Sequence, residues 1–136
     1  MGTPAEGLAR LRAAADSGVL DELCERYSIR VLTVFGSTAR GEARARDLDI
    51  GVLIEPGVAF DLFMLVAELM ELAGLDEVDV AHLNRGGPVI KERALVGSIA
   101  LYERAPGALA SAQIAAMGER VETDANRRLN LRLMAQ

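Results

Sequence analysis

Hydrophobic and polar positions along this chain follow two alternating periods, one typical of strands and one of helices. Apolar runs with β-branched or alternating character predict strands at 31–35, 50–54, 77–83 and 98–103. Between them, apolar residues recur at helical spacing, and one helix is expected to open at Asp61 and end at Gly74. Strands that alternate with helices predict an α/β fold, with a mixed sheet and helices packed mainly on one face.

The first strand is followed at once by Gly36 and Ser37. Glycine lets another group approach the backbone closely, and the residues after it are expected to form about two helical turns. Amide groups at a helix start carry the positive end of the helix dipole, so a phosphate can bind at Gly36 and Ser37, with the Ser37 hydroxyl as an added donor. Arg40 lies one turn further along. An ordinary helix cap would give the same pair, so the pair alone leaves both interpretations open.

Two aspartates stand at the start of the second strand. In an extended chain, residues two apart share a face, so Asp47 and Asp49 are expected to project together while Leu48 and Ile50 point into the core. Two neighbouring carboxylates repel each other, and partial burial would return a proton to at least one of them. The pair is therefore best explained as ligands of a hard divalent ion, and Mg²⁺ is the natural candidate.

A third carboxylate occurs on the next strand, where Val78 and Val80 share one face and Asp79 takes the other. If this strand lies beside the one that carries Asp49, Asp79 completes a triad able to hold two ions about 4 Å apart. A lone strand aspartate would more simply be a solvated surface residue. The presence of the other two acids favours the metal interpretation.

These motifs together resemble a known enzyme signature. The run from Phe35 to Gly41, the Asp47-Leu48-Asp49 segment and the later Val78-Asp79-Val80 segment resemble the minimal nucleotidyltransferases of the DNA polymerase β-like superfamily. The stretch from Leu83 to Arg104 resembles the MntA-type antitoxins that are paired with HEPN ribonuclease toxins. The likeness covers about residues 17–110.

The resemblance implies the small polymerase β palm-like fold, with two Mg²⁺ ions and ATP as substrate. It assigns catalysis and metal binding to Asp47, Asp49 and Asp79, and nucleotide binding to Gly36, Ser37 and Arg40. The MntA likeness implies AMP transfer to a tyrosine hydroxyl of a cognate HEPN toxin. One alternative is a non-catalytic antitoxin that blocks its toxin sterically. A transferase for a small molecule such as an aminoglycoside ranks last, because no substrate domain is evident.

The chain departs from the family pattern in one place. Nine residues separate Ser37 from Asp47, where the family usually has ten, and Arg46 occupies the position of a serine. The shorter loop could shift the phosphate turn relative to the carboxylates. This departure bears on the catalytic rate more than on the fold.

Composition narrows the remaining possibilities. The 136 residues are 51% hydrophobic, which predicts a single domain with a sizeable core. We expect this domain to span 1–136, with a core at about 17–104 and a C-terminal helical extension at about 106–134. The net charge of −5 argues against direct nucleic-acid binding. The sequence begins without a signal peptide, and no apolar run reaches the roughly 20 residues of a membrane span, so a cytoplasmic location without membrane contact is expected.

Four other features of the chain carry expectations. Cys24 is expected to be a buried apolar residue, and His82 to pack at a strand end. Arg85 could neutralise triphosphate charge or be solvated in a loop. A helix from Pro106 towards Met134 would be about 40 Å long, more than a domain of this size needs. Its end is either a frayed tail or a docking segment for a protein partner or a second copy, which would give a hetero-oligomer or a homodimer.

Overall fold

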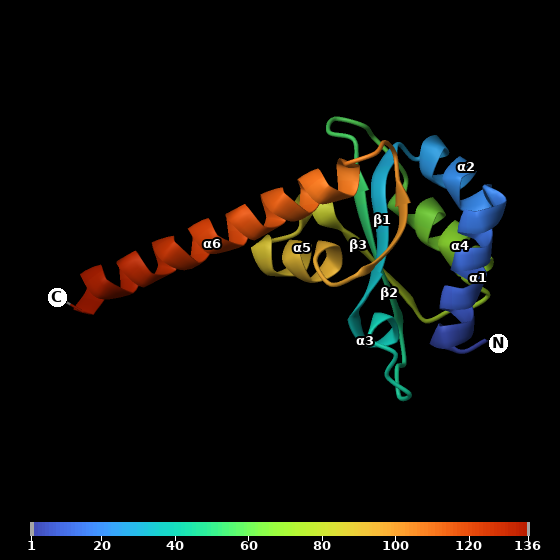
Figure 1. Ribbon diagram of the computed structural model, residues 1–136, viewed down its shortest axis with the longest axis horizontal. Coiled ribbons are helices and arrows are strands. Elements are labelled where there is room, and N and C mark those ends of the chain that lie inside the picture. The colour runs from blue at the N-terminus through green and yellow to red at the C-terminus, as the bar shows by residue number, and fades with distance from the viewer. Residues whose placement is uncertain (1, 136) are drawn as a thin grey trace.

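The computed structural model describes residues 2–135 and is built around one four-stranded sheet (Figure 1). Its strands are β1 (Ile29–Phe35), β2 (Leu48–Ile54), β3 (Val78–His82) and β4 (Ile99–Glu103), in the order β3-β2-β1-β4. β1 is antiparallel to β2 and β4, whereas β2 and β3 are parallel. The sheet is therefore mixed, as the sequence predicts.

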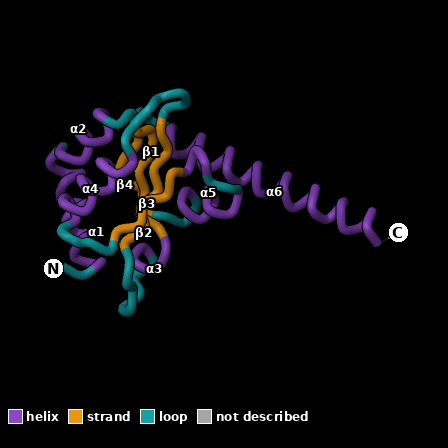
Figure 2. Tube along the Cα trace, turned by 180° about the vertical axis from the view of Figure 1, so that it is seen from behind, coloured by secondary structure: helices purple, strands orange, loops and turns teal. Residues whose placement is uncertain are grey.

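Three of the six α-helices within residues 2–135 lie on one face of this sheet (Figure 2). That layer consists of α1 (Pro4–Ser17), α2 (Val19–Arg26) and α4 (Leu62–Ala73). The other face carries α5 (Pro88–Leu95) and the first turns of α6 (Ala108–Ala135). Two short elements, α3 (Gly36–Ala39) and the 3₁₀ turn η1 (Leu83–Arg85), follow β1 and β3. Three layers result, with the sheet in the middle (Figure 1).

Side chains of β2 alternate strictly between the two helical layers that cover the sheet. Its even-numbered residues, from Leu48 to Ile54, are at most 1% exposed and belong to the larger core under α1, α2 and α4. Asp49, Gly51 and Leu53 point to the opposite face because side chains alternate along a strand. Leu8, Leu11 and Ala14 of α1 also join the larger core, which therefore begins before residue 17.

The face that carries Asp49 holds a smaller core, and α5 is fixed tightly on it. The Thr33 hydroxyl donates a hydrogen bond to the Ala94 carbonyl at 2.5 Å. A Cβ atom at Gly51 would lie 3.1 Å from the Ala94 Cβ. Because glycine has no side chain, α5 can approach β2 closely at this point. Val31, Phe35, Leu83, Ala94, Leu95 and Ala116 form this smaller core.

The segment between β1 and β2 is less helical than the sequence suggests. About two helical turns are expected after Gly36, but α3 has four residues and ends at Ala39. Gly41 then adopts a φ of 72°, which a right-handed helix cannot include. The expectation of two turns is wrong because the short connection must return to β2 within a few residues.

The C-terminal helix has the predicted length and runs away from the rest of the molecule (Figure 1). α6 has 28 residues, and among its described residues Ala116 is the buried one. Its first turns are tied to α5 by Lys91–Glu119 at 3.2 Å and Glu92–Arg120 at 3.6 Å. Within residues 2–135, no helix combines the length and apolar character that crossing a membrane demands.

Candidate active site

Pairing of β2 with β3 brings two of the predicted acids side by side. Asp49 and Asp79 are register partners in the parallel pair, so their Cα atoms lie on adjacent strands about 4.8 Å apart and both side chains leave the same face. Asp47 comes directly before β2 and is exposed, as is Asp79, whereas Asp49 is half-buried. Leu48 and Ile50 are fully buried on the opposite face, as predicted.

The electrostatics of Asp49 reflect this grouping. Burial raises the pKa of its carboxyl above the ordinary value of 3.8, and the nearby charges of Asp79 and Asp47 raise it further. Arg93 and Arg40 act in the opposite direction and favour the charged form. Because burial and these two neighbouring acids disfavour the charged form of Asp49, nearby positive charge is needed to keep that carboxylate ionised.

Gly36 lies directly against Asp49. The residue before it, Phe35, pairs with Asp49 across the β1–β2 ladder. Gly36 has a φ of 75°, and a methyl group added there would overlap the Asp49 carboxylate. α3 starts at this glycine, and no side chain caps its first turn. The predicted phosphate turn therefore meets one of the predicted carboxylates, Asp49, and Ser37, which follows Gly36, is half-buried.

A residue that the sequence did not single out joins the turn to the acids. The Thr38 hydroxyl, which is 6% exposed, donates a hydrogen bond to the Asp47 carbonyl at 2.7 Å. This bond closes the connection in which nine residues separate Ser37 from Asp47. A small hydroxyl residue next to the glycine-serine pair was the available signal, but its acceptor could be known only from the folded loop.

Basic residues differ in how they relate to this site. Arg40 is near enough to affect Asp49 and also pairs with Glu42 at 3.1 Å. Arg93, on α5, was not predicted, and it too acts on Asp49. Arg85 lies in η1, past the end of β3 that is remote from Asp79, where it lines a hollow with His82 and Asn84. Its position favours the loop interpretation over contact with a triphosphate.

The donor set at this site suits a hard divalent ion. All three acids offer carboxylate oxygens, which Mg²⁺ prefers. Asp49 and Asp79 leave the same face of the sheet on neighbouring strands, and Asp47 directly precedes β2. Within residues 2–135, no three His, Cys, Asp or Glu side chains already stand in a metal-binding arrangement. The backbone thus brings Asp47, Asp49 and Asp79 near one another, and their carboxylates would have to rotate to share an ion.

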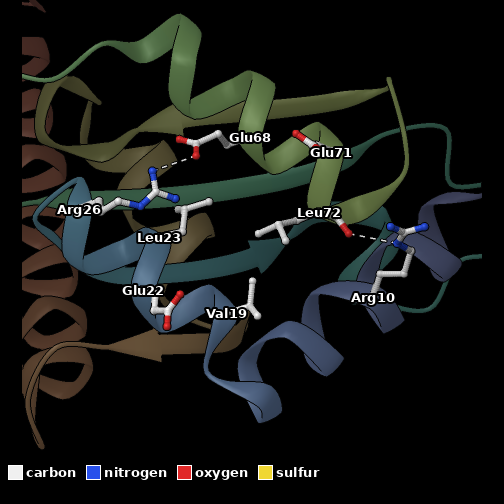
Figure 3. A pocket seen from close by; sticks show the side chains of 8 residues that line it. All are labelled: Arg10, Val19, Glu22, Leu23, Arg26, Glu68, Glu71 and Leu72. Carbon is white, nitrogen blue, oxygen red and sulfur yellow. Dashed lines mark hydrogen bonds and ion pairs between the residues drawn. The ribbon is translucent and has the colours of Figure 1, made fainter.

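A hollow of about 360 Å³ lies on the other side of the sheet, between α1, α2 and α4 (Figure 3). Arg26 pairs there with Glu68 at 2.9 Å, and Arg10 donates to the Leu72 carbonyl at 3.1 Å. Glu22 and Glu71 also line it, so positive and negative groups are mixed. Because its arginines are already engaged and the three acids are on the opposite face, this hollow is a poor candidate for binding a triphosphate.

Comparison with known families agrees with this geometry. The model described as "Polymerase beta, Nucleotidyltransferase" matches residues 19–106, which span every strand and the three aspartates of the site. The chain belongs to this nucleotidyltransferase family. A search of curated proteins gives no significant match.

Solved structures with this nucleotidyltransferase fold include antitoxins. A toxin–antitoxin complex with AMP-PNP has a chain with a TM-score of 0.66 and 17% identity, over 86% of this chain and 96% of the other. A complex of tri-AMPylated HEPN toxin with MNT antitoxin from Shewanella oneidensis gives 0.64 and 15%, over 92% and 99%. An MntA–HepT complex gives 0.62 and 15%, over 88% and 96%. At these identities the similarity establishes the fold.

Proposed function

We propose that this protein is a Mg²⁺-dependent nucleotidyltransferase that moves AMP from ATP to a tyrosine hydroxyl of a HEPN-type toxin and thereby acts as its antitoxin. The observation that carries the proposal is the placement of Asp79 beside Asp49, with Asp47 next to them and the Gly36 turn against them. Complexes with AMP-PNP and with a tri-AMPylated toxin among the structures of similar fold support the choice of nucleotide and acceptor.

Each site residue has a role in this reaction. The amides of Gly36 and Ser37 and the Ser37 hydroxyl would bind the β- and γ-phosphates, with Arg40 adding positive charge. Asp47, Asp49 and Asp79 would hold two Mg²⁺ ions, which supply stabilisation of charge on the reacting phosphate. Arg40 would have to leave Glu42 to reach a phosphate, because the two are paired at 3.1 Å.

The chemistry proposed is an in-line displacement at the α-phosphorus. The tyrosine oxygen forms a bond to that phosphorus as the bond to the bridging oxygen breaks, and pyrophosphate leaves on the Ser37 side. Asp79 would accept the phenolic proton, a role supported by its exposure on β3 away from the glycine turn. The product is tyrosyl-AMP on the toxin, and pyrophosphate is the second product.

We propose α6 as the surface that meets the toxin. Ile114, Met117 and Val121 recur at helical spacing and are 71%, 49% and 69% exposed. Ala112 and Ala116 of the same helix pack on the smaller core, so these three side chains lie on the side of α6 that faces away from the body. We call them the outward stripe. We propose a HEPN toxin as the partner of the outward stripe because a chain of similar fold was crystallised with such a toxin.

The decisive test mixes the protein with its toxin. With Mg-ATP, the wild-type chain should raise the intact mass of the toxin by one or more AMP units, and Asp47→Asn with Asp49→Asn should abolish that gain because it removes both charges with little change in volume. A control with Asp21→Asn and Glu25→Gln removes two exposed carboxylates of α2 and should transfer AMP normally.

Other outcomes would identify other functions. Inhibition of the toxin in a stable complex, with no mass gain by the wild type, would support a steric antitoxin in place of an enzyme. AMP transfer by the Asn double variant at the wild-type rate would overturn the assignment of the site.

A further inference from the structure

Three consecutive residues of α5 are charged, and they differ in their partners. Lys91 pairs with Glu119 at 3.2 Å and Glu92 with Arg120 at 3.6 Å, so both are engaged by α6. Arg93 is exposed and forms no ion pair with any of residues 2–135. A free guanidinium on a helix whose neighbouring charges are paired needs a separate explanation.

The seating of α5 places this free arginine next to the acids. Ala94, the residue after Arg93, is held on the sheet by the hydrogen bond from Thr33 and by the close approach at Gly51. Gly51 lies two residues beyond Asp49 on the same face of β2, about 7 Å along the strand. An arginine side chain spans such a distance, so Arg93 can reach the space above Asp49 from the α5 side.

The position of Arg93 in α5 offers a second explanation for its charge. It lies in the last turn of α5, where a cation offsets the helix dipole. Offsetting the dipole does not require a position beside Asp49, and a dipole role alone would leave nucleotide binding unaffected by its removal.

We propose that Arg93 binds the phosphate chain of the nucleotide from the α5 side, opposite the Gly36–Ser37 turn. This inference rests on the proposed nucleotidyltransferase function. An arginine can hold two phosphate oxygens at once through its planar guanidinium. A triphosphate held between the glycine turn and Arg93 would lie over Asp47, Asp49 and Asp79, and Arg93 would stabilise charge on the phosphate during transfer.

The experiment measures the affinity of the full-length chain for Mg–AMP-PNP by calorimetry, together with AMP transfer to the toxin. Arg93→Met should weaken AMP-PNP binding by about tenfold or more and slow transfer by about a hundredfold. Arg93→Lys should recover part of the affinity, since charge remains without the paired donors. Arg12→Met, which removes an exposed arginine of α1 on the other face, should bind and transfer like the wild type.

Several results would overturn the inference. Unchanged AMP-PNP affinity in Arg93→Met would show that Arg93 serves only α5 or the solvent. An equal loss in Arg12→Met would assign the effect to net charge, and a lowered melting temperature in Arg93→Met would assign it to folding. If the wild type binds AMP-PNP but transfers no AMP, the proposed function fails, and the affinity comparison still decides the role of Arg93.

Discussion

At the scale of single residues, the site depends on the fit between Gly36 and Asp49. The carboxylate occupies the space where any other residue would place its Cβ, and the φ of 75° is one that side chains disfavour. Glycine therefore meets two requirements here: it allows the turn into α3, and it lets the acid approach the turn that is proposed to bind phosphate.

We predict that Gly36→Ala lowers AMP transfer by at least about a hundredfold, because the methyl group displaces Asp49 and a shift of about 1 Å in a reacting group has that effect. Gly41→Ala is the matched control, since Gly41 has a similar φ of 72° but no atom within 4 Å of the added methyl. It should lose some stability and keep transfer. An equal loss of AMP transfer in the two variants would show that backbone strain, and not contact with Asp49, causes the loss.

At the scale of elements, each helix is placed by the strand beside it. Alternation along β2 and β3 could be predicted because every second residue is apolar, and this pattern assigns Asp49 and Asp79 to one face once the strands are paired. The orientation of α5 could not be predicted, because Lys91, Glu92 and Arg93 are adjacent charges whose directions depend on contacts with α6 and β2.

The outward stripe of α6 gives a prediction at this scale. Ile114→Glu with Val121→Glu should weaken association with the toxin at least tenfold, because two exposed apolar side chains become charged in the proposed interface. Size-exclusion chromatography of the mixed proteins measures the loss. The melting temperature and the AMP-PNP affinity should not change, since neither residue is buried.

A control with the same added charge separates the stripe from the helix as a whole. Asn126→Glu with Asn130→Glu lies on the opposite side of α6, and both positions are exposed, so toxin binding should persist. Toxin binding unchanged by the stripe variant would contradict the interface. A change in the oligomeric state of the isolated chain would then assign the stripe to a second copy.

At the scale of the whole molecule, stability depends on links between the helices of one layer as well as on the two cores. The Tyr27 hydroxyl at the end of α2 donates a hydrogen bond to Glu68 of α4, and Arg26 pairs with the same carboxylate at 2.9 Å. This hydrogen bond raises the pKa of Tyr27 to about 12 and lowers that of Glu68. Burial raises both pKa values, so it adds to the shift of Tyr27 and opposes that of Glu68.

We predict that Tyr27→Phe lowers the free energy of unfolding near neutral pH by roughly 1 kcal/mol, allowing for solvent screening of the pair. The raised pKa of Tyr27 means that its contribution is complete below its ordinary pKa of 10.0 and is lost as pH rises towards about 12. The lowered pKa of Glu68 means that the bond also weakens as pH falls below 4.5. Urea unfolding of both proteins across pH measures the difference, and a difference that grows above pH 10 would contradict the assignment.

Sequence by itself determined the alternating strands and helices, the two aspartates at the start of β2, the length of α6 and the resemblance to nucleotidyltransferases. These features are local, because period, composition and short motifs are set within a few residues. Tertiary structure decided that Asp79 stands beside Asp49, that Thr38 holds the carbonyl of Asp47 and that α5, which carries Arg93, packs against Gly51 of β2. Those contacts join segments that are distant in the chain or held by a folded loop, and only the pairing of β2 with β3 and the packing of α5 on β2 select them.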